Sequence, residues 1–174
     1  MAKSVELRRH TASDGDVLTE DGVRDAVAVG RSLAGDYAVV ISSGAQRSTQ
    51  TAACFLAGLG SRVDGGVIVD ERFRSSVEDR WRDAYEQAGA GDIESFRKAD
   101  PDLVEKESAL LGEALRAVFE ALPPGGRALI VGHSPMQEAA AYGLTGTAIY
   151  PLKKGASVLV VEEDEDSYKV EPTE

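Results

Sequence analysis

The sequence is poor in the residue types that most often mark a chemical specialisation: its 174 residues include one cysteine, one tryptophan and two histidines. The single cysteine, Cys54, excludes a disulfide within the chain. Because it lies in an apolar helical stretch, we interpret it as a buried structural thiol rather than a nucleophile. No run of about 18 or more apolar residues is present, so no membrane-spanning helix is predicted. The start, Met1 to Ser4, leads straight into a predicted strand and lacks the apolar core of a signal peptide. These features favour a cytoplasmic protein.

Positive charge is also scarce. The sequence has 19 lysines and arginines against 30 aspartates and glutamates, so the formal net charge is −11. An acidic surface repels nucleic acid and anionic membranes, so we expect neither as a partner. An anionic substrate would therefore need a local cluster of arginines. The length and a hydrophobic content of 43% predict one domain over residues 1–174, with a core of useful size.

Apolar runs alternate with helical patterns along the chain. The runs rich in β-branched residues predict strands at 5–7, 37–41, 67–69 and 128–131, with a closing hairpin from 157–162 and 168–170. A long helix is predicted to start at Asp100-Pro101. The alternation favours a three-layer α/β/α sandwich with a mostly parallel central sheet.

Residues 71–100 differ from the rest, because charges of both signs are dense and three aromatic residues are interleaved with them, namely Trp81, Tyr85 and Phe96. We interpret this segment as a helical excursion over one edge of the sheet. It is either a lid or a solvated helix pair anchored by its aromatic side chains.

Three helix starts carry capping signals. Thr19 precedes two acidic residues and is predicted to cap the first helix. Ser43 with Gln46, and Ser134 with Gln137, each match a capping box, and Pro135 would occupy the first position of the second of these helices.

Both histidines follow the ends of predicted strands. His10 comes directly after Arg9, and His133 follows a buried run that ends at Gly132. Arg47 lies in the first turn or so of the helix that Ser43 opens. If the three strands are parallel and adjacent, these side chains meet at one edge of the sheet.

Such a cluster suits a phosphoryl group. Guanidinium groups bind phosphate oxygens bidentately, and helix N-termini attract anions. A neutral imidazole can attack phosphorus to form a phosphohistidine, which water then hydrolyses. Arg9 and Arg47 could instead be surface ion-pair partners. Two histidines plus acids could hold a metal ion, but the arginines beside them would repel a cation and no metal-ligand spacing is present, so no metal site is predicted.

Four sequence blocks together resemble the histidine phosphatase superfamily, the phosphoglycerate-mutase-like group. They are Leu7-Arg8-Arg9-His10-Thr11, Leu18-Thr19-Glu20-Asp21-Gly22, Ser42-Ser43-Gly44-Ala45-Gln46-Arg47-Ser48-Thr49-Gln50-Thr51-Ala52 and Val131-Gly132-His133-Ser134-Pro135. They occur in the family's order and span nearly the whole chain. The short loop between His10 and Leu18 is similar to the small phosphohistidine-phosphatase branch.

The resemblance implies a phosphoglycerate-mutase-like fold and a reaction without a cofactor. His10 would be the nucleophile, and Arg9, Arg47 and His133 would complete the phosphate pocket. Two further polar side chains beside the histidines, Thr11 and Ser134, would contribute to substrate binding.

The chain departs from the family pattern at two places. Thr11 stands where the family has glycine. Ser75 follows Phe73-Arg74 where the family's proton-donating glutamate usually stands. The nearest replacement donor is Glu78, with Glu71 and Asp79 as weaker candidates.

We therefore predict a phosphatase that hydrolyses a phosphomonoester or a phosphorylated protein side chain through a phosphohistidine on His10. One alternative is a phosphoglycerate-type mutase, which we favour less because the insertions that would enclose its pocket are missing. Another is a non-catalytic phospholigand-binding module, which Thr11 and the missing glutamate motivate.

Overall fold

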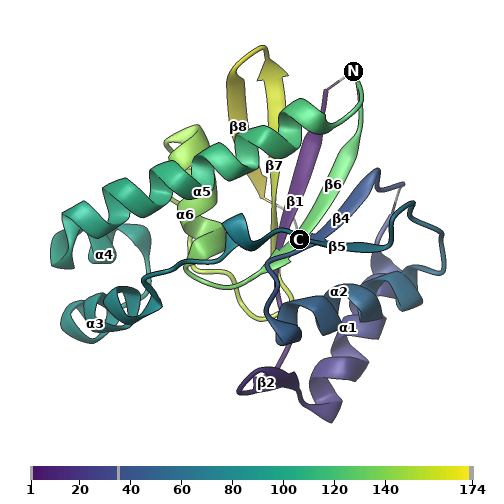
Figure 1. Ribbon diagram of the computed structural model, residues 1–174, viewed down its shortest axis with the longest axis horizontal. Helices are drawn as coiled ribbons and strands as arrows, with labels where there is room; N and C mark the ends of the chain where they lie inside the picture. The colour runs from purple at the N-terminus through teal and green to yellow at the C-terminus, as the bar shows by residue number, and fades with distance from the viewer. Residues whose placement is uncertain (1, 35, 173–174) are drawn as a thin grey trace.

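The computed structural model describes residues 2–34 and 36–172, which form a central six-stranded sheet with helices on both faces (Figure 1). The strand order is β5-β4-β6-β1-β7-β8. The strands are β1 (Ser4–Arg9), β4 (Val39–Ser42), β5 (Val67–Val69), β6 (Arg127–Gly132), β7 (Ser157–Asp164) and β8 (Ser167–Pro172). A separate two-stranded hairpin, β2 (Ser13–Asp14) and β3 (Val17–Leu18), follows β1.

Strand β6 occupies the centre of the parallel part of the sheet. It pairs in parallel with β1 on one side and with β4 on the other, and β4 pairs in parallel with β5. Strands β7 and β8 extend the β1 edge in antiparallel fashion, as the predicted closing hairpin. The sheet is therefore mostly parallel, and the predicted adjacency of the strands that end at His10, Ser43 and His133 is confirmed.

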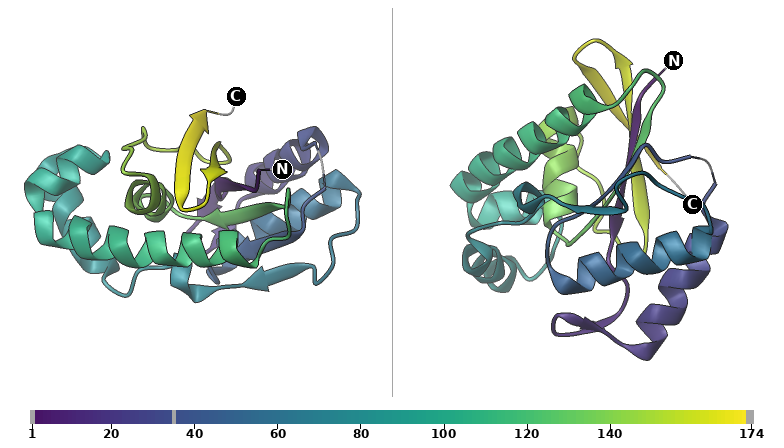
Figure 2. Two further views of the ribbon diagram at one scale, coloured as in Figure 1. Left: turned by 90° about the horizontal axis from the view of Figure 1, so that it is seen from above. Right: turned by 45° about the vertical axis from the view of Figure 1, so that its right-hand side comes forward.

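Helices cover the two faces of the sheet in separate pairs (Figure 2). Helices α1 (Glu20–Ser32) and α2 (Gln46–Leu59) pack together on one face, while α5 (Pro101–Ala121) and α6 (Met136–Thr145) pack together on the other. The alternation of side chains along β6 explains this division. Ala128 and Ile130 belong to the core under α5 and α6, whereas Leu129 and Val131 belong to the core under α1 and α2. This is the three-layer α/β/α arrangement that the sequence predicts.

The charged segment 71–100 folds as η1 (Glu71–Phe73), α3 (Glu78–Ala88) and α4 (Ile93–Ala99), next to the start of α5 (Figure 1). Trp81, Ile93 and Phe96 are buried in the same core as α5 and α6. Its outward-facing residues form ion pairs such as Arg80 with Asp100. The segment is therefore an anchored helical excursion. No helix in the described ranges is both long and apolar enough to cross a bilayer.

The predicted caps are correct for one helix and wrong for two. Thr19 caps α1, since its hydroxyl accepts a hydrogen bond from the Gly22 amide at 3.0 Å. Helix α2 begins only at Gln46, and its N-cap residue is Ala45, because the Ser43 hydroxyl bonds to another partner in the site described below.

The predicted cap of α6 is wrong for a similar reason. Helix α6 begins at Met136, so Pro135 holds the N-cap position rather than the first helical position. The Ser134 hydroxyl donates to the side chain of Glu138 instead of accepting from a backbone amide. In both cases the serine hydroxyl bonds to a side chain, His133 or Glu138, instead of accepting from a backbone amide at the helix start.

Candidate active site

The candidate site lies where β1, β4 and β6 end. Helix α2 leaves β4 over one face of the sheet, and α6 leaves the neighbouring β6 over the opposite face. Chains that diverge in this way open a crevice at the carboxyl edge of the sheet. The backbone fixes the two sides of the crevice, because the His10 amide donates to the Gly132 carbonyl at 3.0 Å and the Ser43 amide donates to the Val131 carbonyl at 3.1 Å.

The two histidines face each other in this crevice. Their ring centroids are 5.8 Å apart with an interplanar angle of 65°. They are 6% and 4% exposed, for His10 and His133 respectively. Residues that are 123 positions apart in the chain therefore form one buried imidazole pair.

The tautomer of His10 follows from its hydrogen bond. Its Nδ1 lies 2.7 Å from the backbone carbonyl oxygen of Thr11. A carbonyl can only accept, so Nδ1 carries the proton and Nε2 keeps its lone pair. Nε2 of His10 is thus the basic nitrogen that the fold leaves available for reaction.

His133 is held by a different contact. Its Nε2 lies 2.7 Å from the hydroxyl oxygen of Ser43, across the boundary between β6 and β4. Its Nδ1 is buried and has no hydrogen-bond partner within the described part of the chain. Buried polar atoms are almost always paired, so an unpaired one in a crevice marks a place where a ligand can bond.

The surroundings keep both imidazoles uncharged. Burial, together with the positive charges of Arg47, Arg9 and Lys154 and against the opposing bond to Thr11, lowers the pKa of His10 from 6.5 to about 4. Burial, followed by the charge of Arg47, lowers the pKa of His133 to about 3. At neutral pH His10 is therefore a neutral imidazole rather than an imidazolium.

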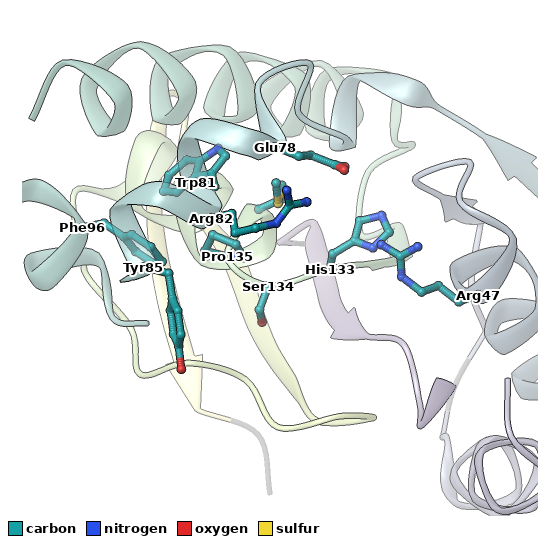
Figure 3. A pocket seen from close by; sticks show the side chains of 10 residues that line it. Arg47, Glu78, Trp81, Arg82, Tyr85, Phe96, His133, Ser134 and Pro135 are labelled. Carbon is teal, nitrogen blue, oxygen red and sulfur yellow. The ribbon is translucent and has the colours of Figure 1, made fainter. Parts of the chain in front are cut away.

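The two arginines expected in the pocket are both at this edge. Arg9 donates from its NH1 group to the Leu152 carbonyl at 2.9 Å, while its buried Nε has no partner among residues 2–34 and 36–172. Arg47 comes from the first turn of α2 and lies beside His133 (Figure 3). Arg8, by contrast, pairs with Glu6 and donates to the Gly155 carbonyl, as a structural residue would.

Asp16 is a site residue that sequence reasoning missed. Its carboxylate pairs with the Arg47 guanidinium at 2.8 Å and accepts from the backbone amides of Arg47 at 3.2 Å and Gln46 at 3.4 Å. It thereby supplies the cap of α2 that Ser43 does not provide. These hydrogen bonds from Arg47 and Gln46 outweigh partial burial and lower the pKa of Asp16. An acid in a hairpin gives no distinct sequence signal, which is why it was not singled out.

Glu138 is a second missed residue. It is buried, and it accepts from the Ser134 hydroxyl at 3.0 Å and from the Leu152 amide at 3.3 Å. Burial raises its pKa against these hydrogen bonds. Because Leu152 also accepts from Arg9, Glu138 ties the start of α6 to the loop that orients that arginine. The sequence signal for Glu138 is its spacing of four residues from Ser134, which places the two side chains within hydrogen-bonding reach at the start of a helix.

The structure gives Thr11 a role inside the turn. Its hydroxyl donates to the Gly22 carbonyl at 2.8 Å and its amide donates to the Thr51 hydroxyl at 3.3 Å. Thr11 also avoids the left-handed region, since Asp166 is the only non-glycine residue in the described ranges with positive φ. The glycine that this loop requires lies in the neighbouring helix α1, because a Cβ added at Gly22 would lie 2.0 Å from the Ala12 carbonyl oxygen.

A cavity of about 280 Å³ opens beside His133, which is the imidazole of the pair that lines it (Figure 3). It is lined by Arg47, His133 and Ser134 at one end and by residues of α3, α4 and the start of α6 at the other, namely Glu78, Trp81, Arg82, Tyr85, Phe96, Pro135 and Met136. Of the three acids considered as proton donors, Glu78 is the one that lines this cavity. It is half-exposed and pairs with Arg74 at 3.2 Å.

The fold and this site together define an α/β protein with a buried imidazole pair and two arginines at the carboxyl edge of its sheet, an arrangement that can bind an anion. The chain belongs to the histidine phosphatase superfamily, branch 1, whose family model matches residues 3–171.

Solved structures share the fold at low sequence identity. Phosphoglycerate mutase from Bacillus anthracis superposes with a TM-score of 0.73 at 18% identity, covering 99% of this chain and 92% of its own. The Bacillus stearothermophilus protein YhfR gives 0.69 at 20% identity, covering 97% and 95%. Phosphoserine phosphatase from Entamoeba histolytica gives 0.68 at 16% identity, covering 91% and 90%. No curated protein matches the chain in sequence.

The lowered pKa values predict an unusual titration. His10 and His133 are the only histidines, so the imidazole proton resonances in an NMR titration report on them alone. We expect inflections near pH 4 and pH 3 rather than near 6.5. Because the unfolded chain binds more protons than the folded one below pH 6.5, the free energy of unfolding is highest above that pH and decreases as the pH falls through 4 towards 3. Two inflections near 6.5 would show that the pair is not desolvated.

A second prediction concerns the bond between Ser43 and His133. Replacing Ser43 with alanine leaves both imidazole nitrogens without a protein partner, and should lower the free energy of unfolding by about 1–3 kcal/mol. Ser48 is the matched control, because it is equally buried but its hydroxyl has no partner within the described residues. Urea denaturation should show Ser48→Ala to be nearly neutral. An equal decrease in the free energy of unfolding of the two variants would show that the bond between Ser43 and His133 does not stabilise the fold.

Proposed function

We propose that this protein is a phosphatase that hydrolyses a phosphomonoester through a phosphohistidine formed on Nε2 of His10. The observation that carries the proposal is the buried, neutral His10, whose protonated Nδ1 is fixed by the Thr11 carbonyl and whose Nε2 remains free. A second imidazole and two arginines stand beside it. This combination supplies a nucleophile together with the groups that bind an anion.

The first chemical step forms the phosphoenzyme. The arginines bind the phosphoryl oxygens and orient phosphorus towards His10. The lone pair of Nε2 forms the N–P bond while the P–O bond to the leaving group breaks, and that oxygen leaves with a proton. His133, held by Ser43, hydrogen-bonds the phosphoryl group and stabilises the charge that develops in the transition state.

The second step releases the phosphate. Water attacks phosphorus, the N–P bond breaks and its electron pair returns to Nε2, which regenerates the neutral imidazole. Glu78 is the acid we assign to donating the leaving-group proton and to accepting one from the water, because it lines the same cavity as His133. In the resting protein its ion pair with Arg74 holds it at the cavity wall, and its carboxylate takes up a proton before it acts as the acid.

Two alternatives have less support. The Bacillus anthracis neighbour is named a mutase and the Entamoeba histolytica neighbour a phosphatase, and at 18% and 16% identity neither name transfers to this chain. A purely binding module would need neither a carboxylate at the cavity nor a fixed His10 tautomer. Both features are present, so we favour hydrolysis.

The proposed function is tested by trapping the intermediate. Rapid acid-free quenching with a labelled phosphomonoester should give base-stable, acid-labile phosphate on the wild-type protein, and His10→Ala should give none. Turnover of a chromogenic phosphomonoester between roughly pH 5 and 8 should likewise disappear in His10→Ala. Equal turnover in the two proteins, or a wild type with neither turnover nor label, would refute the proposal.

The contribution of Arg47 to oxyanion binding can be measured separately from turnover. Arg47→Ala should weaken vanadate binding about 10- to 100-fold, because a charge-assisted hydrogen bond contributes about 1.5–3 kcal/mol. Arg62→Ala is the control, since Arg62 is almost fully exposed and pairs with the equally exposed Asp64 at 3.5 Å. Calorimetric titration with vanadate gives both constants. Indistinguishable affinities in the two variants would place Arg47 outside the phosphate pocket.

A further inference from the structure

We propose that the cavity beside the imidazole pair binds an uncharged aromatic leaving group, so that the substrates are small aryl-type phosphomonoesters rather than phosphoproteins. This inference rests on the proposed function and specifies its substrate class. It follows from the aromatic side chains that line the cavity, from the ion pairs at its aromatic end and from its volume.

The far end of the cavity is built from aromatic side chains held against each other. Trp81 and Phe96 meet edge to face, with ring centroids 5.1 Å apart and an interplanar angle of 90°, and Tyr85 lies 6.5 Å from Phe96. Trp81 and Phe96 are buried, whereas Tyr85 is 54% exposed at the rim. Such a wall presents ring faces and edges of the kind that pack on another aromatic ring.

This wall is continuous with the reactive end of the site. Figure 3 shows Trp81, Tyr85 and Phe96 on one side of the cavity and His133 with Arg47 on the other, with Pro135 between them. A phosphoryl group held by the arginines would therefore direct its ester substituent towards the aromatic end.

The charges at the aromatic end already have partners. Glu78 pairs with Arg74 at 3.2 Å, and Arg82 pairs with Asp79 at 3.0 Å. A leaving group with a second negative charge would have to compete with Asp79 for Arg82. An uncharged ring leaves the ion pair between Arg82 and Asp79 intact, so this pairing favours a neutral substituent.

The cavity volume limits the size of that substituent. A volume of about 280 Å³ lies just below the roughly 300–1,000 Å³ typical of pockets for drug-sized ligands. It suits a phosphoryl group with one ring system. The flanking backbone of a phosphorylated residue within a protein would lie outside this cavity, so the cavity itself contacts only the phosphoryl group and its ring.

The test measures binding of unreactive phosphonates by calorimetry, which does not depend on turnover. Wild-type protein should bind benzylphosphonate at least about tenfold more tightly than methylphosphonate. Tyr85→Ala should reduce that affinity ratio about three- to tenfold, the size expected for one aromatic pair. Tyr150→Ala is the matched control, because Tyr150 is 91% exposed and is not among the cavity residues. It should keep the wild-type ratio.

Binding of a phosphonate-containing peptide tests whether the substrate is a small molecule or a protein. A peptide that carries a phosphonomethyl-phenylalanine presents the same aryl group with flanking backbone, and should bind no more tightly than benzylphosphonate. Binding of the peptide more than about tenfold tighter would overturn the small-molecule assignment, since the flanking residues would then contribute to recognition.

The failures of the two proposals are distinguishable. If a phosphohistidine forms on His10 but the benzyl-to-methyl ratio is near one, or is the same in Tyr85→Ala, the phosphatase stands and the aromatic subsite is refuted. If no phosphoenzyme forms and neither vanadate nor any phosphonate binds, the proposed function fails, and the substrate inference fails with it.

Discussion

The position of β6 between β1 and β4 is the constraint on which the site depends. The backbone of β6 positions three groups of the site. The His10 amide donates to the Gly132 carbonyl, the Ser43 amide donates to the Val131 carbonyl, and His133 directly follows the last residue of the strand. The buried side-chain amide of Gln137 also connects β6 to β1, because it donates to the carbonyls of Arg8 at 2.9 Å and Ile130 at 3.1 Å. A one-residue slip of β6 would turn its core side chains to the wrong faces, so packing under both helix pairs fixes the geometry of the crevice as well.

Burial then determines the chemistry of the imidazoles. A histidine at the surface would be partly protonated near neutral pH, whereas desolvation and neighbouring guanidinium groups keep this pair neutral. The same burial leaves polar atoms of Arg9 and His133 without partners within the described ranges. A core residue with such an atom would only destabilise the fold, but both of these border the crevice, where phosphoryl oxygens can accept or donate the missing bonds.

Much of this arrangement could be predicted from the sequence, because strand ends carry their functional residues in local patterns. The runs before His10 and His133 predicted parallel, adjacent strands, and the structure has them. The errors arose where a distant residue competes with a local pattern. Ser43 and Gln46 match a capping box, yet the Ser43 hydroxyl bonds to an imidazole 90 residues away. Asp16 replaces it as the cap, and no local signal connects that hairpin acid with α2.

Asp16 also bears on how a chain of net charge −11 can bind an anion. Charges are screened over about 8–10 Å at physiological ionic strength, so groups within the crevice matter more than the acidic surface. There, Asp16 bonds to one terminal nitrogen of Arg47 and to the backbone of its own helix start, which fixes the direction of the guanidinium. An oriented donor keeps its advantage for phosphate oxygens, because its conformational entropy is lost on folding rather than on binding. The acid closest to the phosphate pocket therefore repels the substrate to a modest degree while it preorganises the arginine that binds it.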